Sequence, residues 1–207
     1  SYMRAWKNTF GSVYNVAEAL AFATAGSYEE GLEDVILNTG ELLAARFVGD
    51  AMSQQDKEYI DNARQAIRTL EQGEKQDELR LEVGSMYLSN GQYLEAMDMF
   101  QEVNSEAYVS QKEELLEKSK HSYFDRLLDV AEDSEGRSSM LLYSIVLAND
   151  DRQASQIDAR LALAEQHIQY QNHDAAKEHL AQLDEMDVPF WYLGAHLKMH
   201  SLHGELK

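Results

Sequence analysis

LRLEVGSMYLSNGQYLEAMDMFQEV, residues 79–103, alternates small and large residues at helical spacing. Residues three or four positions apart share one face of an α-helix. Gly84 and Tyr87 therefore fall on one face of a first predicted helix, and Ala96 and Phe100 on one face of a second. The small residues allow the two backbones to approach, and the rings fill the space beside them. The stretch predicts a pair of packed antiparallel helices.

Asn90 and Gly91 separate the two predicted helices. Glycine takes the left-handed conformation of a helix C-cap without a Cβ penalty, and Tyr93 then restarts the pattern. Together these residues resemble the tetratricopeptide repeat, a helix–turn–helix unit of about 34 residues that stacks into solenoids. The resemblance implies an all-α fold, a right-handed superhelical array of about six antiparallel helix pairs. An unrelated helical hairpin with the same spacing is the alternative.

Two further stretches repeat the pattern. The first copy consists of Ala19, Phe22, Gly26, Tyr28, Gly31 and Val35, at almost the same offsets. The third copy places small and large residues at Ala164, Ala176, Leu180 and Leu183. In this third copy His167 replaces the aromatic of the first helix, and Gln171 replaces the turn glycine. We expect Asn172 to adopt the left-handed turn there, because its short polar side chain tolerates that conformation.

These copies predict a single tetratricopeptide-like domain over residues 1–207. Its expected parts are best repeats at 12–45, 77–110 and 157–190, an irregular helical region at 105–150 and a capping helix at 190–203. Within the irregular region, either a longer helix or an irregular hairpin is expected. The polar stretch 131–139 is either a loop within the array or a break between two subdomains, and the loop is favoured because no long Pro/Gly/Ser linker flanks it.

The chain is strongly acidic, with 37 acidic and 18 basic side chains and a formal charge of −19. Such a surface repels phosphate backbones and anionic lipid, so nucleic-acid and membrane-surface binding are disfavoured. There is no cysteine, and no apolar run approaches the ~20 residues that cross a bilayer. We expect a bacterial protein of the cytoplasm or periplasm, with the cytoplasm favoured.

The candidate chemistry is sparse. His196, His200 and His203 stand at i, i+4 and i+7 of a predicted helix, where neutral imidazoles can bind zinc. The HExxH signature is absent, so solvated or packed histidines are the better interpretation. No nucleophile elbow, phosphate loop or GxGxxG sequence occurs. We therefore expect no enzyme activity and no cofactor.

In the tetratricopeptide family, the first helix of each unit lines a concave face that binds extended peptides or helices. The resemblance places partner-binding residues at Val16, Leu20, Glu78, Leu81, Ser85, Leu88, Leu161, Glu165 and Ile168. Packing against neighbouring helices is the alternative role for these residues. Family members that capture acidic tails carry lysine and asparagine where this chain has Leu81 and Ser85. The implied partner instead has apolar anchors and basic flanks.

The leading functional hypothesis is a non-enzymatic adaptor or assembly scaffold that binds another protein or peptide. The alternative is a regulatory sensor domain whose superhelix changes curvature on binding a peptide or small ligand. A homodimer is also expected if the C-terminal helix exposes Trp191, Leu193 and Leu197, because an unstacked repeat leaves an apolar face uncovered.

Overall fold

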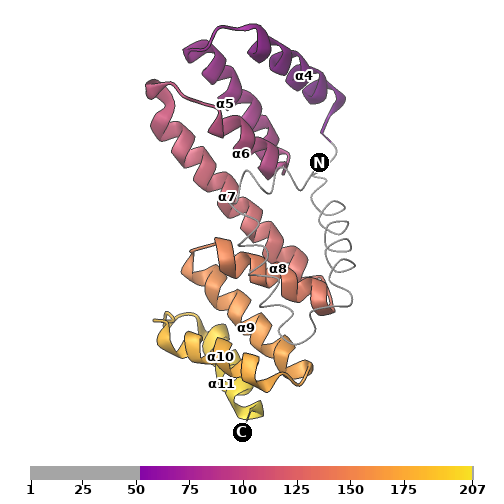
Figure 1. Cartoon of the computed structure of the whole chain (residues 1–207), viewed down its shortest axis with the longest axis vertical. Helices are drawn as coiled ribbons and strands as arrows, with labels where there is room; N and C mark the ends of the chain where they lie inside the picture. The colour runs from indigo at the N-terminus through magenta and orange to yellow at the C-terminus, as the bar shows by residue number, and fades with distance from the viewer. Residues whose placement is uncertain (1–51, 207) are drawn as a thin grey trace. The chain divides into compact units, whose positions relative to one another are not determined.

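The structure, a computed structural model, describes residues 52–206 (Figure 1). Regular structure in this range is entirely helical, without strands, which confirms the all-α prediction for the described residues. The α-helices are α4 (Gln54–Thr69), α5 (Glu74–Ser89), α6 (Tyr93–Gln101), α7 (Val109–Glu132), α8 (Gly136–Asn149), α9 (Gln153–Gln169), α10 (His173–Glu185) and α11 (Leu193–Glu205). A short 3-10 helix, η1 (Glu106–Tyr108), precedes α7.

Contacts within the chain divide the described residues into two compact units, 52–124 and 125–206. The first unit contains α4, α5 and α6, and the second contains α8 to α11; the boundary between them falls within α7. The prediction of a single repeat domain stays a prediction. The predicted first repeat, with Val16 and Leu20, lies outside the described residues.

Helix α7 shows which of the two arrangements expected for the irregular region is formed. It is continuous over 24 residues, so the irregular region contains a longer helix rather than a hairpin before residue 132. The predicted loop at 131–139 reduces to the three residues between Glu132 and Gly136. Ser139, in the first turn of α8, donates a hydrogen bond of 2.7 Å to the Ala131 carbonyl and so ties α8 to the end of α7.

The α5–α6 pair packs as the spacing of small and large residues predicts. Gly84 is buried, and a Cβ at this position would lie 2.4 Å from Cε1 of the Phe100 ring. Phe100 and Ala96 are completely buried. The ring of Phe100 therefore occupies the space that a side chain at residue 84 would need, which explains the glycine.

Both α5 and α9 end in the same hydrogen-bonded turn. After α5, Gln92 N donates to Tyr87 O and Gly91 N to Leu88 O, the two bonds of a Schellman motif. Gly91 has a φ of 73°, the left-handed conformation that the motif requires. The predicted turn glycine is thus confirmed.

The corresponding turn after α9 corrects the prediction for Asn172. Gln171, with a φ of 58°, is the left-handed residue, because it occupies the same place in the motif as Gly91. Asn172 N donates to His167 O and Gln171 N to Ile168 O. Asn172 itself is the N-cap of α10, and its side chain accepts a hydrogen bond from Ala175 N. The sequence comparison assigned the strained conformation one residue too late.

A glutamine–arginine pair recurs 80 positions apart in the two units. Gln76 donates from Nε2 to the carbonyls of Ile67 and Leu70 at the end of α4, and Arg80 donates to Gln76 Oε1 at 2.9 Å. In the second unit, Gln156 and Arg160 make the same contacts, with the carbonyl groups now at the end of α8. Gln156 donates from Nε2 to Leu147 O at 2.9 Å and to Asp150 O at 2.5 Å, and Arg160 donates to Gln156 Oε1 at 3.3 Å. Each pair satisfies carbonyls that a helix C-terminus leaves without an intrahelical partner.

Asp77 is a buried carboxylate that holds the chain after α6 against α5. It accepts hydrogen bonds from Asn104 N at 3.0 Å, from Ser105 N at 2.8 Å and from the Ser105 hydroxyl at 2.6 Å. Arg80 pairs with its other oxygen at 2.7 Å. Burial by itself raises the pKa of Asp77, but these hydrogen bonds outweigh burial and lower the pKa to about 2. Ile157 occupies the equivalent position in the second unit.

The second unit is built around α9, which contacts α8, α10 and α11. Its main apolar cluster comprises Ile157, Leu161, Ala164, Leu180, Leu183, Ala195 and Leu202. The buried His167 packs against the buried His179 of α10, with ring centroids 5.5 Å apart. Burial lowers the pKa of His179 to about 4, and the charges of His167 and Arg160 add to this effect.

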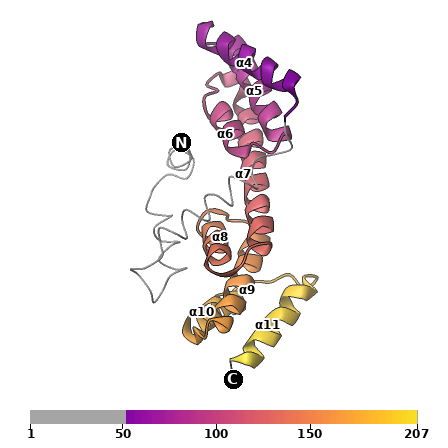
Figure 2. The ribbon, with the colours of Figure 1, turned by 90° about the vertical axis from the view of Figure 1, so that its right-hand side faces the viewer.

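Helix α11 lies beside α9, and a view turned by 90° shows its ribbon at an angle to α10 (Figure 2). Ala195 and Leu202 are its buried residues. Trp191, Leu193 and Leu197 are exposed by 72%, 66% and 72%. This exposure is the condition under which the sequence predicts a homodimer, and the dimer itself stays a prediction.

Candidate docking groove

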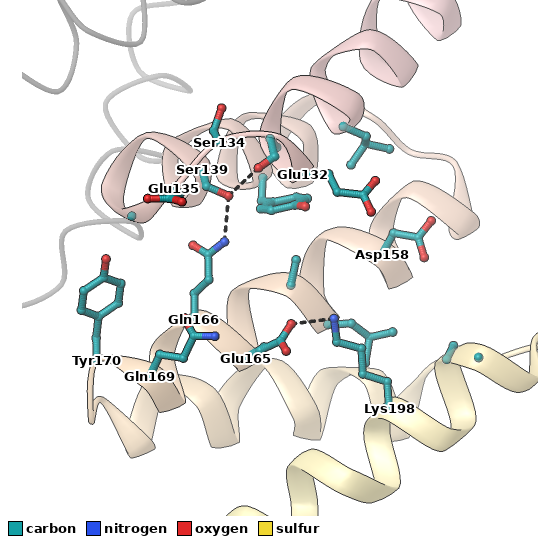
Figure 3. Close-up of a pocket in the computed structure, with 18 of the residues that line it drawn as sticks. Glu132, Ser134, Glu135, Ser139, Asp158, Glu165, Gln166, Gln169, Tyr170 and Lys198 are labelled. Carbon is teal, nitrogen blue, oxygen red and sulfur yellow. Dashed lines mark hydrogen bonds and ion pairs between the residues drawn. The ribbon is translucent and has the colours of Figure 1, made fainter.

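An open groove of about 880 Å³ lies within the second unit (Figure 3). Three helices contribute most of its lining: the C-terminal end of α7, the length of α9 and the beginning of α11. The loop before α8 and the first two turns of α8 complete it. The groove is therefore lined by α7, α9 and α11, together with the α7–α8 connection and the first part of α8.

The spacing of residues along α9 explains why one face of that helix forms the groove. The lining residues from α9 are Asp158, Leu161, Ala162, Glu165, Gln166 and Gln169. They recur every three or four positions and so share one face. The neighbouring faces carry Ile157 and Ala164, which are buried in the core and fix the rotation of the helix.

Hydrogen bonds order the side of the groove next to α8. Gln166 donates from Nε2 to the Ser139 hydroxyl at 2.8 Å, and Ser139 donates in turn to Ala131 O. This chain connects α9, α8 and α7. The second polar atom of Gln166, Oε1, is buried and has no hydrogen-bond partner among the described residues. It is an acceptor available to a donor that enters the groove.

The groove is strongly acidic. Its charged lining residues are the carboxylates Glu132, Glu135, Asp158 and Glu165 and a single ammonium group, Lys198. Lys198 forms an ion pair of 2.7 Å with Glu165. Neither Glu132 nor Glu135 forms an ion pair with a residue that the structure describes. The lining therefore has an excess of negative charge that its own cation does not neutralise.

The negative charge of the groove helps to raise the pKa of two tyrosines, Tyr192 and Tyr143. Tyr192 donates its hydroxyl to Asp158 Oδ1. Burial, this hydrogen bond and the charge of Asp158 raise the pKa of Tyr192 to about 12. The pKa of Tyr143 is also raised to about 12, first by burial and then by the charges of Glu132, Asp158 and Glu165. These three carboxylates, from α7 and α9, thus lie within electrostatic range of one aromatic side chain.

Of the partner-binding residues predicted in the third copy, two line the groove and one does not. Leu161 and Glu165 both line the groove, although Leu161 is only 4% exposed and also belongs to the core. Ile168 packs against the core of the second unit and is not part of the lining.

In the first unit, Glu78 and Ser85 are exposed on α5, and the Ser85 hydroxyl donates to Leu81 O at 2.7 Å. Leu81 is buried in the core of this unit, and Leu88 packs against that core. Replacing either leucine with a charged residue would therefore perturb folding rather than binding alone.

The sequence pattern identifies only the α9 side of the groove. The register of the third copy places Asp158 on the same face as Leu161 and Glu165, and all three line the groove. Glu132, Tyr143 and Lys198 come from other helices. No local pattern links these three residues to α9, since they approach it only through tertiary packing.

The candidate metal site is not formed. Within residues 52–206, no group of three or more histidine, cysteine, aspartate or glutamate side chains is placed to hold a metal ion. His196 lies 3.2 Å from Pro189 O and His203 lies 3.2 Å from Asp184, so these two imidazoles have different neighbours. In the same part of the chain, every helix is too short or too polar for a transmembrane span.

Comparison of the chain with protein-family models, with curated proteins and with solved structures finds no match to any of them.

Proposed function

We propose that this chain is a non-enzymatic protein-interaction module, an adaptor or scaffold that binds a peptide or helix of a partner in the groove of the second unit. The observation that carries the proposal is the groove itself, with about 880 Å³ of open space along three helices. An opening bordered by several helices suits a segment of polypeptide, which recognition grooves hold through apolar anchors and a polar rim.

The arrangement of helices supports a tetratricopeptide-like array as the basis of this function. The α5–α6 and α9–α10 pairs share the Schellman turn and the glutamine–arginine pair. In such an array α7, α9 and α11 are the first helices of successive pairs, the helices that line the concave face in the tetratricopeptide family. The right-handed superhelix and the count of six pairs belong to this proposal.

A peptide-display experiment tests the proposal. The full chain is immobilised and used to select binders from a phage library of random dodecapeptides. Ala162, in the groove, is then replaced with tryptophan to obstruct the opening, and Ala181→Trp on the exposed side of α10 is the matched control. We expect Ala162→Trp to weaken the selected peptides at least about tenfold, since excluded anchors usually dominate binding.

Ala181→Trp is expected to bind as the wild type does. The helical circular dichroism and melting temperature of both variants show whether folding is intact. A library that yields no binder, or binders that Ala162→Trp does not affect, would contradict the proposal. A ligand sensor would in addition change its radius of gyration in solution scattering when a peptide binds.

A further inference from the structure

We infer that the end of the groove between Glu132 and Asp158, beside Tyr143, receives an arginine side chain of the partner. This inference rests on the proposed function and assigns a ligand chemistry to one place in the groove. It depends on the distribution of charge, on the placement of two carboxylates on different helices and on the existing hydrogen bonds of these carboxylates.

The charge of this end favours a cation. Glu132 and Asp158 come from different helices, α7 and α9, and both line the same opening (Figure 3). Lys198, the cation of the lining, pairs with Glu165. Asp158 has the Tyr192 hydroxyl on Oδ1, a neutral donor that leaves its charge in place. A cationic group of the partner would therefore gain charge-assisted hydrogen bonds without displacing an internal ion pair.

The geometry favours arginine over lysine. A guanidinium group presents five N–H donors in a plane, so it can contact carboxylates on two helices at once, whereas an ammonium group acts as a point charge. Tyr143 lines the same part of the groove but is only 8% exposed, so the preference for arginine rests on the two carboxylates from different helices. The unpartnered Oε1 of Gln166 offers a further acceptor along the same groove.

A metal ion does not fit this end equally well. Divalent cations in proteins take several oxygen ligands in a defined geometry. No set of three or more acidic or histidine side chains with that arrangement occurs in the described part of the chain. Two carboxylates without a third acidic or histidine ligand among the described residues suit an organic cation better.

The test uses three fluorescent nonapeptides based on the sequence ALRALRALR, in which the basic positions carry arginine, lysine or the neutral isostere citrulline. Binding to the full chain is measured by fluorescence anisotropy at low and at physiological salt. We expect the arginine peptide to bind about tenfold more tightly than the citrulline peptide, and more tightly than the lysine peptide.

Variants of the protein locate the effect. Glu132→Gln and Asp158→Asn each remove one charge from the groove, and the asparagine still accepts the Tyr192 hydrogen bond. Glu185→Gln removes one charge from the exposed part of α10 and is the matched control. Each groove variant should weaken the arginine peptide about fivefold or more, while Glu185→Gln should change its affinity less than twofold.

Equal losses in all three variants would show attraction to the acidic surface as a whole and overturn the inference. Equal binding of the lysine peptide would overturn the choice of arginine. If library-selected peptides are lost in Ala162→Trp but unchanged in Glu132→Gln and Asp158→Asn, the groove is a docking site without this arginine contact. If Ala162→Trp has no effect either, the proposed function fails as well.

Discussion

The contact between Gly84 and Phe100 makes a sharp prediction about the packing of the α5–α6 pair. A Cβ at residue 84 would lie 2.4, 2.8 and 2.9 Å from three atoms of the Phe100 ring. Ordinary carbon contacts begin at about 3.5 Å, and the ring has no exposed surface through which it can move aside. The substitution Gly84→Ala should therefore overpack the seam between the two helices.

The expected magnitude combines two opposing effects. Overpacking a well-filled core costs typically 1–3 kcal/mol, and three close ring atoms place this site in the upper part of that range. Replacing a helical glycine with alanine returns about 1 kcal/mol through helix propensity. We expect a net loss of about 1–2 kcal/mol in the free energy of unfolding. Gly204→Ala, in a helix where a Cβ meets nothing within 4 Å, is the control and should be neutral or slightly stabilising.

A second substitution distinguishes overpacking from other causes. In the second unit, Ala164 and Leu180 occupy the positions of Gly84 and Phe100, and both are buried. The double variant Gly84→Ala/Phe100→Leu recreates that combination, because the new methyl group enters space that the ring has left. We expect it to be more stable than the sum of the single effects by about 1 kcal/mol or more.

Urea unfolding followed by circular dichroism measures the wild type, Gly84→Ala, Phe100→Leu, the double variant and the Gly204→Ala control. A Gly84→Ala protein at least as stable as the wild type would show that the ring is not confined. Strict additivity in the double variant would mean that residues 84 and 100 do not share the same space. Either result would refute the equivalence of the two helix pairs at this position.

Three further outcomes follow from individual side chains. The pKa of His179 is about 4 in the folded protein and about 6.5 when unfolded, so its neutral form is favoured and stability falls as pH drops below 6.5. Between pH 7 and pH 5 this amounts to about 2 kcal/mol in urea unfolding. His179→Met should remove this part and leave the contribution of His167, whose pKa is also lowered by burial, whereas a flat wild-type profile would contradict the prediction. The pKa of Asp77 is lowered, so its contribution is present above pH 4 and disappears towards pH 2. Asp77→Asn should cost about 2 kcal/mol at pH 7, about half of that at pH 3 and very little near pH 2, as measured by chemical denaturation. Gln171→Gly should raise the unfolding free energy by about 0.5–1 kcal/mol, because glycine tolerates the left-handed turn, whereas an equal gain from Asn172→Gly would restore the sequence-based assignment.

Local packing was predictable because its partners lie close together in the sequence. Gly84, Gly91 and Phe100 fall within one helix–turn–helix stretch, where helical spacing alone determines which residues face each other. The same reasoning failed at Gln171, because a glutamine gives no sign of a positive φ when the turn is imposed by the helices on either side. Composition favoured helix throughout, and the described residues contain no strand.

Function-related residues were less predictable for a physical reason. Glu132, Asp158 and Lys198 meet around one opening only after three helices have packed. Acidic residues on helices are usually solvated. The register of the third copy places Asp158 and Glu165 on the groove face, but nothing in the sequence separates Glu132 from the solvated acidic residues. Asp77 is a further example. An acidic residue in the first turn of a helix is usually expected to be solvated, but Asp77 is buried and accepts four hydrogen bonds.

The two helix pairs show which features set their geometry. The backbone contacts coincide, with a Schellman turn at the same place and glutamines that bind the end of the preceding helix. The core side chains differ: the α5–α6 pair has a glycine facing a phenylalanine, and the α9–α10 pair has an alanine and a leucine at the same positions. A methyl group gained on one helix is matched by a smaller side chain on its neighbour, so the filled volume changes little. The pairing of helices therefore depends on satisfied backbone ends and on a nearly constant sum of side-chain volumes.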